Sequence, residues 1–238
     1  MTTLLIATRN AHKVGEIQSI LGAPFQFLTL NDFSDAPKVV EDADTFAGNA
    51  TKKAVELARW LSAAGASRLT PHASRFFVLA DDSGLEVDAL GGAPGVHSAR
   101  FAALDRSADG SSASSPENSP DADNNAKLLR LLKDMPPEKR TGRFRCVIAL
   151  VPVPSGKVES ASPVCLVDEF EAHTFDGACA GRIQFSASGH GGFGYDPLFV
   201  PDGFTQSFSE LGEDVKNKLS HRAKALEKLK VYWDTNRR

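Results

Sequence analysis

The first residues whose types and spacing could form a binding site for an anion occupy positions 8–13: Thr8, Arg9, Asn10, Ala11, His12 and Lys13. They follow an apolar run, Leu4–Ala7, that predicts a short buried strand, and Asn10 is suited to cap a helix after it. Such a junction offers backbone N–H groups and the positive end of a helix dipole to an anion, and Lys13 adds a cation. The alternative is an ordinary capped helix with an exposed Lys13. Spacing alone slightly favours that alternative, because the chain has no Walker pattern.

A second cluster is acidic. Asp81-Asp82-Ser83-Gly84 follows the apolar run Phe76–Ala80, and Glu41-Asp42 lies upstream. Adjacent carboxylates at the end of a buried strand repel each other, and a hard cation such as Mg²⁺ would relieve that repulsion. The competing interpretation is a solvated turn, which Asp and Gly favour for local reasons. Taken alone, the turn is the simpler explanation, although the apolar strand before it raises the odds of a functional site.

The third cluster is the glycine-rich segment Gly191–Pro197, which contains Phe193, Gly194, Tyr195 and Asp196. Glycines around two aromatic residues let a flat ligand approach the backbone, and an aromatic face can stack on a nucleobase for about 1–3 kcal/mol. Asp196 could accept hydrogen bonds from ring N–H groups. The alternative is a glycine-rich hairpin whose aromatic side chains join the core.

The fourth cluster combines Lys216 with Ser220, His221 and Arg222. Cations at a helix start oppose the helix dipole, and their presence there indicates a bound anion or an acceptor-rich ligand. The alternative is a solvated, charged helix face. Together the four clusters supply cations for phosphates, carboxylates for Mg²⁺ and an aromatic ring for a base.

The elements that would position these clusters alternate between helices and strands, which predicts an α/β fold with a mixed sheet. A helix capped by Thr45 buries the face that starts at Phe46, and strands are expected at Leu85–Ala89, Phe144–Val153 and Cys165–Phe175. A closing helix runs through Leu226 and Trp233, with Ser220 as its cap. The strand that begins at Phe76 is expected to stop at Asp81.

Two segments lack bulky apolar residues. Asp105–Asp123 consists almost entirely of Ser, Asp, Ala, Asn and Pro, which predicts a mobile surface insertion. The insertion lies within one domain that is expected to span residues 1–238. A helix is expected after it, from Asn124 to Leu132. Ala63–Ala73 is a smaller insertion of the same kind. Deletion of residues 105–123 is expected to leave activity nearly unchanged.

Composition narrows the classes of function. The formal net charge is −3, which argues against a partner that is a nucleic acid polymer. The 3 cysteines are scattered without a C-x-x-C pair, so we expect neither a thiolate metal site nor a disulfide framework. No apolar run approaches the ~20 residues of a membrane span, and Leu4–Ala7 is too short for a signal peptide. The expectation is a soluble, cytoplasmic protein.

The motifs occur in one order. Thr8-x-Asn10-x-x-Lys13 is followed by the long block from Ala80 to Arg100, by Gly192–Pro197 and by Ser220-His221-Arg222. This arrangement closely resembles the non-canonical purine nucleoside triphosphate pyrophosphatases, the inosine triphosphatase family, from Leu4 to about Leu229. The resemblance implies an elongated mixed sheet with flanking helices, two lobes around a central active-site cleft and a homodimer. It also implies Mg²⁺-dependent hydrolysis of inosine, deoxyinosine and xanthosine triphosphates to the monophosphate and pyrophosphate.

Residue by residue, the resemblance makes Asp82 the catalytic carboxylate, with Mg²⁺ held by Asp82 and Glu41. It assigns the substrate to the other residues of the four clusters: Thr8, Arg9, Asn10, Ala11, His12, Lys13, Ser83, Phe193, Gly194, Tyr195, Asp196, Lys216, His221 and Arg222. Val40 and Gly48 depart from the pattern, because the family often has Glu at both positions. Two alternatives remain, a Maf-like pyrophosphatase for other modified nucleotides and a catalytically silent nucleotide-binding protein.

Overall fold

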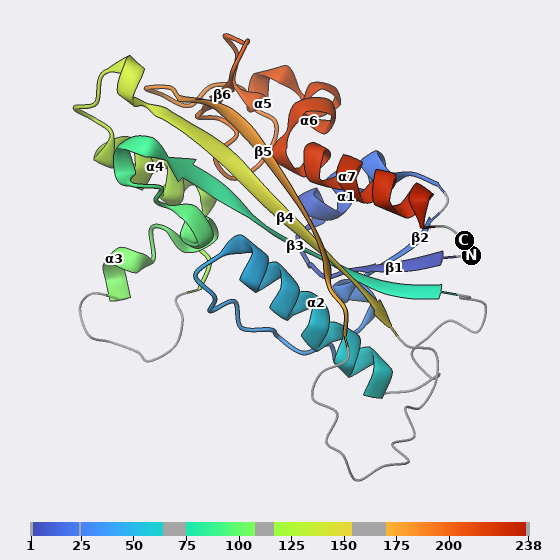
Figure 1. The fold of residues 1–238 in the computed structure, drawn as a ribbon. Coiled ribbons are helices and arrows are strands. Elements are labelled where there is room, and N and C mark those ends of the chain that lie inside the picture. The colour runs from blue at the N-terminus through green and yellow to red at the C-terminus, as the bar shows by residue number, and fades with distance from the viewer. Residues whose placement is uncertain (1, 24, 64–74, 108–116, 154–169, 237–238) are drawn as a thin grey trace. The chain divides into compact units, whose positions relative to one another are not determined.

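The computed structural model describes residues 2–23, 25–63, 75–107, 117–153 and 170–236 (Figure 1). Its strands are β1 (Thr2–Ile6), β2 (Phe25–Thr29), β3 (Arg75–Val87), β4 (Thr141–Val153), β5 (His173–Ile183) and β6 (Phe199–Pro201). Its helices are α1 (Ala11–Leu21), α2 (Phe46–Ala63), α3 (Leu104–Ser107), α4 (Asp121–Leu131), α5 (Phe208–Leu211), α6 (Glu213–Leu219) and α7 (His221–Thr235). Short 3-10 turns at Leu30–Asp32, Asp88–Leu90, Gly95–Arg100 and Pro137–Lys139 complete the described elements.

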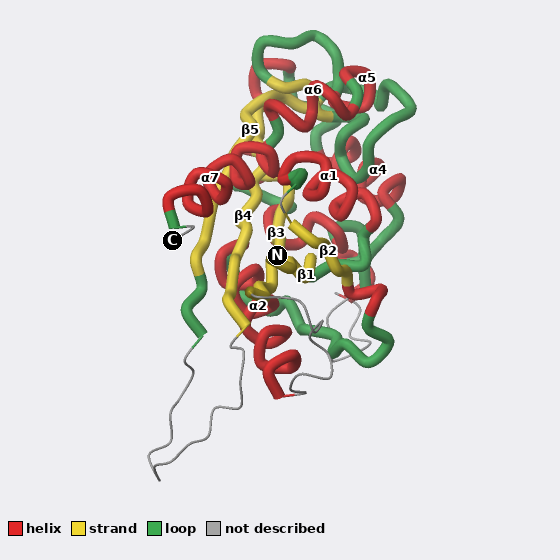
Figure 2. Tube along the Cα trace, turned by 90° about the vertical axis from the view of Figure 1, so that its right-hand side faces the viewer, coloured by secondary structure: helices red, strands yellow, loops and turns green. Residues whose placement is uncertain are grey.

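The strands form a six-stranded sheet in the order β2-β1-β3-β4-β5-β6. β1 runs parallel to both β2 and β3, whereas β5 and β6 are antiparallel. Figure 2 shows β1 and β2 as adjacent short strands. Helices interleaved with a sheet that contains both orientations confirm the predicted α/β fold with a mixed sheet.

The chain divides into two compact units. Unit 1 contains Met1–Asp82, Val147–Phe175 and Tyr232–Arg238, and unit 2 contains Ser83–Cys146 and Asp176–Val231. The chain therefore passes from one unit to the other within β3, β4, β5 and α7. The peptide bond that follows Asp82 is the first of these passages.

Unit 1 is built on the parallel strands β1, β2 and β3. Leu4, Leu5 and Ile6 of β1 are fully buried, and so are Val78 and Leu79 of β3. Helix α2 buries the apolar face that its periodicity predicts: Phe46, Ala50, Ala54, Leu57, Ala58 and Leu61. Trp233 closes this core with edge-on contacts, 5.0 Å between ring centroids, to Phe25 and to Phe77.

Unit 2 has its own core, in which residues from β3, β4 and β5 pack against α4 and α5. Its buried members are Leu85, Val87, Phe101, Leu128, Leu132, Phe144, Cys179, Ile183, Tyr195, Leu198, Phe199 and Phe208. Gly177 of β5 brings α7 onto the sheet, because an added Cβ would clash with the His221 carbonyl oxygen and would lie 2.6 Å from the Ala225 nitrogen. The position of Gly177 thus fixes the first turn of α7.

Several expected boundaries differ from the structure. β3 does not stop at Asp81 but continues to Val87, so Asp81–Gly84 is strand and not a turn. α4 begins at Asp121, three residues before the expected start. A strand was expected at Cys165–Phe175, of which residues 165–169 lie outside the described residues. The observed strand is His173–Ile183. Its small alternating residues give little hydrophobic signal in the sequence. Residues 64–74 and 108–116, which include most of the expected insertion 63–73 and about half of 105–123, also lie outside the described residues.

Two further observations concern the expectations from composition. No helix of the described residues is long and apolar enough to cross a membrane. Cys146 and Cys179 are buried, and burial raises the pKa of the Cys179 thiol to about 11. A thiol with so high a pKa is an apolar core group at neutral pH rather than a nucleophile.

Candidate active site

The segment between β1 and α1 caps the helix through Asn10. Its Oδ1 accepts hydrogen bonds from the backbone N–H of His12, at 3.0 Å, and of Lys13, at 3.2 Å. The Thr8 hydroxyl oxygen accepts from the Asn10 N–H at 3.1 Å. The predicted cap is therefore confirmed, and these side chains occupy amides that an anion would otherwise contact.

Asp81 and Asp82 lie in the middle of β3 and are 3% and 6% exposed. Successive side chains of a strand point to opposite faces, so the two carboxylates do not converge on one point. Asp81 forms an ion pair with Lys13 of α1, and Asp82 accepts a hydrogen bond from Asn49 of α2 at 3.0 Å. The strand separates the charges that a turn would have brought together, and the solvated turn is excluded.

Asp82 is held in an environment that resists its ionisation. The pKa of Asp82 is raised to about 6, chiefly because the carboxyl is buried. The nearby Glu41 carboxylate contributes to that rise, while Lys13, Lys53 and the Asn49 amide oppose it. A carboxyl with a pKa near neutrality can exchange a proton at physiological pH, as a general base must. Asp82 is thus a buried carboxyl with a raised pKa, and its catalytic role stays a prediction.

Lys53 and Asn49 are site residues that the sequence analysis missed. The Lys53 ammonium lies 2.5 Å from Oε1 of Glu41 and donates to the Asp81 carbonyl oxygen at 3.0 Å. Both residues lie on the buried face of α2: Asn49 is 1% exposed and Lys53 is 8% exposed. Their spacing of four residues on an otherwise apolar helix face was the available signal, because polar side chains there need buried partners.

Asp82 and Glu41, the residues expected to hold a metal ion, both lie in unit 1 and are electrostatically coupled. The described residues contain no cluster of three or more His, Cys, Asp or Glu side chains that could do so. Mg²⁺ is commonly bound by one or two carboxylates, with water and substrate phosphate oxygens as the remaining ligands. The electrostatic coupling of Glu41 to the buried Asp82 carboxyl indicates a pair that a cation would stabilise. The carboxyl groups of Asp82 and Glu41 therefore fit a hard cation such as Mg²⁺.

Unit 2 contains a second group, formed around Gly192–Asp196, here called the base loop because the resemblance implies that it binds the base. Oδ2 of Asp196 accepts from the Phe193 N–H at 2.9 Å and forms a 2.6 Å ion pair with Lys216. The Lys216 ammonium also lies 4.3 Å from the centroid of the Phe193 ring. Gly192, with φ of +76°, has no room for a Cβ beside the Asp196 carboxylate. These contacts shape the loop and direct Oδ2 of Asp196 toward the protein itself.

The two aromatic residues of the base loop differ in their surroundings. Tyr195 is buried, its hydroxyl donates to the Ser98 carbonyl oxygen at 2.9 Å, and it belongs to the core of unit 2. Phe193 is only partly buried and is approached by Lys216 and by Arg222, whose guanidinium carbon is 5.9 Å from the ring centroid. The interpretation as a core hairpin thus holds for Tyr195, whereas Phe193 keeps surface for a ligand.

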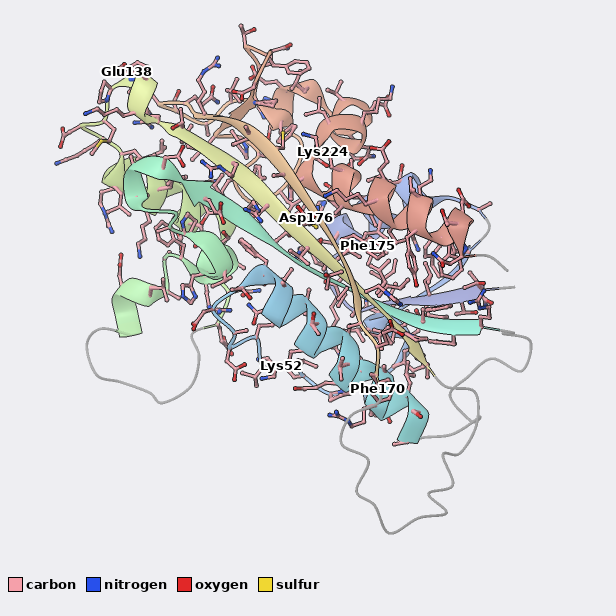
Figure 3. All side chains as sticks on the ribbon, in the orientation of Figure 1. Lys52, Glu138, Phe170, Phe175, Asp176 and Lys224 are labelled. Carbon is pink, nitrogen blue, oxygen red and sulfur yellow. The ribbon has the colours of Figure 1, made fainter. Side chains whose placement is uncertain are left out.

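The first turn of α7 places His221 and Arg222 in the interior of unit 2. The Ser220 hydroxyl caps the helix by accepting from the Ala223 N–H at 3.1 Å, as predicted. His221 stacks on Phe144 with 4.8 Å between centroids, and Arg222, 1% exposed, donates to the Ser83 hydroxyl at 2.9 Å. Lys224, labelled in Figure 3, extends from α7 to the Ala178 carbonyl oxygen of β5 at 2.8 Å. Arg222 is thus a buried cation, not part of a solvated charged face.

The fold and these two groups define an α/β protein with a mixed sheet, in which buried carboxylates and lysines form one cluster and an aromatic ring with cations forms another. Comparison with known proteins identifies it further: the chain belongs to the Ham1 family, which it matches over residues 4–232. The resemblance seen in the motifs is confirmed by this match and by the relatives described next.

Similar proteins cover nearly the whole chain. A dITP/XTP pyrophosphatase of Geobacter sulfurreducens is 44% identical over 231 residues, which are 97% of this chain and 96% of that protein. A dITP/XTP pyrophosphatase of Desulforamulus reducens is 42% identical over 94% of this chain and 92% of that protein. Among solved structures, the Ham1 protein of Staphylococcus aureus aligns with a TM-score of 0.71 and 28% identity, and it covers 98% of both chains. The nucleoside-triphosphatase, or dITP/XTP pyrophosphatase, of Mycobacterium abscessus aligns with a TM-score of 0.65 and 32% identity over 95% of this chain and 98% of that one.

Proposed function

We propose that this chain hydrolyses the non-canonical purine nucleoside triphosphates ITP, dITP and XTP to the monophosphate and pyrophosphate, and so clears them from the nucleotide pool. The observation that carries the proposal is the buried Asp82 carboxyl beside Lys13, Lys53 and Glu41 in a chain whose full-length relatives are named dITP/XTP pyrophosphatases. A poised carboxyl among cations is what water attack on a phosphoanhydride requires.

The phosphate and metal chemistry belongs to unit 1. We assign the triphosphate to the side chains of the segment from Thr8 to Lys13. Asp82 and Glu41 would hold Mg²⁺, which would supply polarisation of the phosphate oxygens. Asp82, once ionised, orients the attacking water and takes its proton as the oxygen approaches the α-phosphorus. Lys13 and Lys53 already lie beside the carboxylates and neutralise negative charge that grows as pyrophosphate leaves.

Recognition of the base belongs to unit 2. Phe193 stacks on the purine, and His221 with Arg222 reads its edge, while Ser83 contacts the substrate next to Asp82 in the sequence. Lys216 lies against Phe193 and Asp196, so we assign it to the base loop and not to the leaving pyrophosphate. A 6-oxo purine offers an acceptor to these donors, whereas adenine presents N6–H donors that leave them unpaired, at a cost of about 1–3 kcal/mol each.

One assay separates this proposal from a Maf-like pyrophosphatase and from a silent binding protein. Pyrophosphate release is measured from ITP, dITP, XTP, ATP, GTP and modified pyrimidine triphosphates, with and without Mg²⁺, for the unmodified chain and for Asp82→Asn. We expect turnover of the 6-oxo purine substrates only with Mg²⁺, and a loss of about 10²-fold or more in kcat for the variant, which still binds nucleotide. Preference for a modified pyrimidine supports the Maf-like alternative, and no turnover of any substrate supports the silent one.

The homodimer and the cytoplasmic location, which the resemblance and the composition imply, stay predictions. Light scattering of the purified chain at micromolar concentration checks the former. A mass of one chain, 25.5 kDa, would contradict it.

A further inference from the structure

The base loop is held at its centre by helix α4. Gly194 has a left-handed backbone, with φ of +62°, between Phe193 and Tyr195. Its N–H donates to Oδ2 of Asp121 at 2.6 Å, and its carbonyl oxygen accepts from Nδ2 of Asn125 at 3.0 Å. Asp121 and Asn125 are four residues apart and therefore lie on one face of α4. Both polar groups of one glycine are thus bound by one helix face, which we call the α4 clamp.

Helix α4 is itself tied to the segment that precedes it in unit 2. Asn124 accepts from the Ala102 N–H at 2.9 Å and donates to the Ala99 carbonyl oxygen at 3.2 Å. Lys127 donates to the Phe101 carbonyl oxygen at 2.7 Å and to Asp105 at 2.6 Å. The α4 clamp therefore holds Gly194 against a fixed part of the fold.

We propose that Asp121 and Asn125 are positioning residues for the base: by fixing Gly194 they preorganise Phe193 for stacking on the purine. This inference rests on the proposed function of Phe193. Glycine visits both signs of φ with little cost, so an unclamped Gly194 would let the neighbouring Phe193 ring sample several directions. Ordering the loop before binding removes that entropic cost from the binding step. The clamp is thus a determinant of affinity for the base and leaves the chemistry at Asp82 unchanged.

The α4 clamp includes a residue of the segment that composition predicts to be dispensable. The segment predicted as dispensable, Asp105–Asp123, contains Asp121 and also Asp105, which pairs with Lys127. A deletion of all of 105–123 would remove one half of the clamp and a tie of α4. We therefore expect that deletion to weaken nucleotide binding, contrary to the expectation from composition.

The test compares Asp121→Ala and Asn125→Ala with two matched variants. Asp121→Asn keeps an acceptor for the Gly194 N–H, and Asp123→Ala removes a carboxylate from the same helix turn without touching Gly194. Each protein is titrated calorimetrically with inosine monophosphate and with inorganic tripolyphosphate, and steady-state kinetics with ITP follow. Thermal unfolding shows which variants are folded.

We expect each alanine variant to bind inosine monophosphate about three- to tenfold more weakly, because one hydrogen bond is lost. Tripolyphosphate affinity and kcat should stay within about twofold, and Asp121→Asn and Asp123→Ala should match the parent. Unchanged affinity for inosine monophosphate in both folded alanine variants overturns the inference, as does an equal loss for tripolyphosphate. If the alanine variants bind inosine monophosphate more weakly than the parent but the parent releases no pyrophosphate, the proposed function is wrong and the inference about Asp121 and Asn125 is retained. If the parent does not bind inosine monophosphate, the inference fails.

Discussion

Asn49 donates from Nδ2 to Oδ2 of Asp82 across 3.0 Å, while its own Oδ1 accepts from the Ala43 N–H across 2.9 Å. The second bond fixes the orientation of the amide, so Asn49 always presents a donor to the carboxylate. The amide therefore favours the ionised form of Asp82, against the burial that raises its pKa to about 6. The result is a carboxyl that titrates near the pH at which the enzyme would work.

The raised pKa of Asp82 makes a prediction for stability. Between pH 4 and 6 the folded chain keeps a proton on Asp82 that the unfolded chain has released, so this group lowers the free energy of unfolding as pH rises through that range. About two pKa units correspond to about 3 kcal/mol. In a chelator, Asp82→Asn should therefore match the parent near pH 4 and unfold at a higher temperature at pH 7.5. A difference in melting temperature that does not change with pH would contradict the assigned pKa.

Lys53 should set the acid limb of the pH profile. Its charge lowers the pKa of Asp82, so Lys53→Met should move the acid limb of kcat/KM for ITP to higher pH. The variant also leaves the buried Asp81 carbonyl oxygen without this donor, which costs about 1–3 kcal/mol of stability. Lys52→Met is the matched control, since Lys52, which is labelled in Figure 3, pairs with the exposed Asp42. Identical profiles for the two variants would exclude Lys53 from the electrostatics of Asp82.

The buried pair between Lys216 and Asp196 should be costly to break on one side only. Both side chains are less than 5% exposed, at 4% and 3%, and lie 2.6 Å apart. Lys216→Met removes the ammonium group that faces the buried Asp196 carboxylate, and we expect a loss of about 3–5 kcal/mol of stability. The double variant with Asp196→Asn should recover part of it, whereas Lys218→Met on the exposed side of α6 should change stability by less than about 0.5 kcal/mol. Urea titration of the four proteins checks this, and an equal loss in the single and double variants would count against the pair.

Arg222 and Phe193 should affect selectivity differently. Arg222→Ala removes a charged donor to the base, so kcat/KM for ITP should fall about 10- to 100-fold more than kcat/KM for ATP. Phe193→Ala removes stacking that any base shares and should weaken both substrates by a similar factor. If Arg222→Ala lowers both equally, the guanidinium serves the phosphates and the account of selectivity is wrong.

The spacing of apolar residues predicted the helices and strands that have a strongly apolar face, and local residue types predicted the helix caps. The buried face of α2, strand β4 and the caps at Asn10 and Ser220 follow from residue types a few positions apart. β3 was interrupted in the prediction because Asp-Asp-Ser-Gly is a turn sequence by local preference. Lys13 and Asn49, which make its burial possible, come from distant parts of the chain. Non-local pairing therefore overrode local propensity.

In the candidate site, too, residues within recognisable local motifs were predicted, whereas residues that act through distant contacts were missed. Asp82, Phe193 and Arg222 were singled out because their residue types suit nucleotide chemistry. Their roles came from the family resemblance and stay predictions. Lys53 and Asn49 were missed because each was assigned to an amphipathic helix from its apolar neighbours alone. The clamp residue Asp121 was placed in an insertion, because composition describes a segment as a whole and not the one side chain that reaches another loop.

The absence of a side chain at Gly177 has a consequence for inheritance as well as for packing. β5 and the first turn of α7 touch there with no space between them, so every other amino acid would push away the turn that carries His221 and Arg222. A missense change at this codon would act as a loss-of-function allele although it alters no group that meets a ligand. In a saturation library selected for activity, Gly177 should retain glycine alone, while Gly15, whose Cβ would meet open space, should accept many residues.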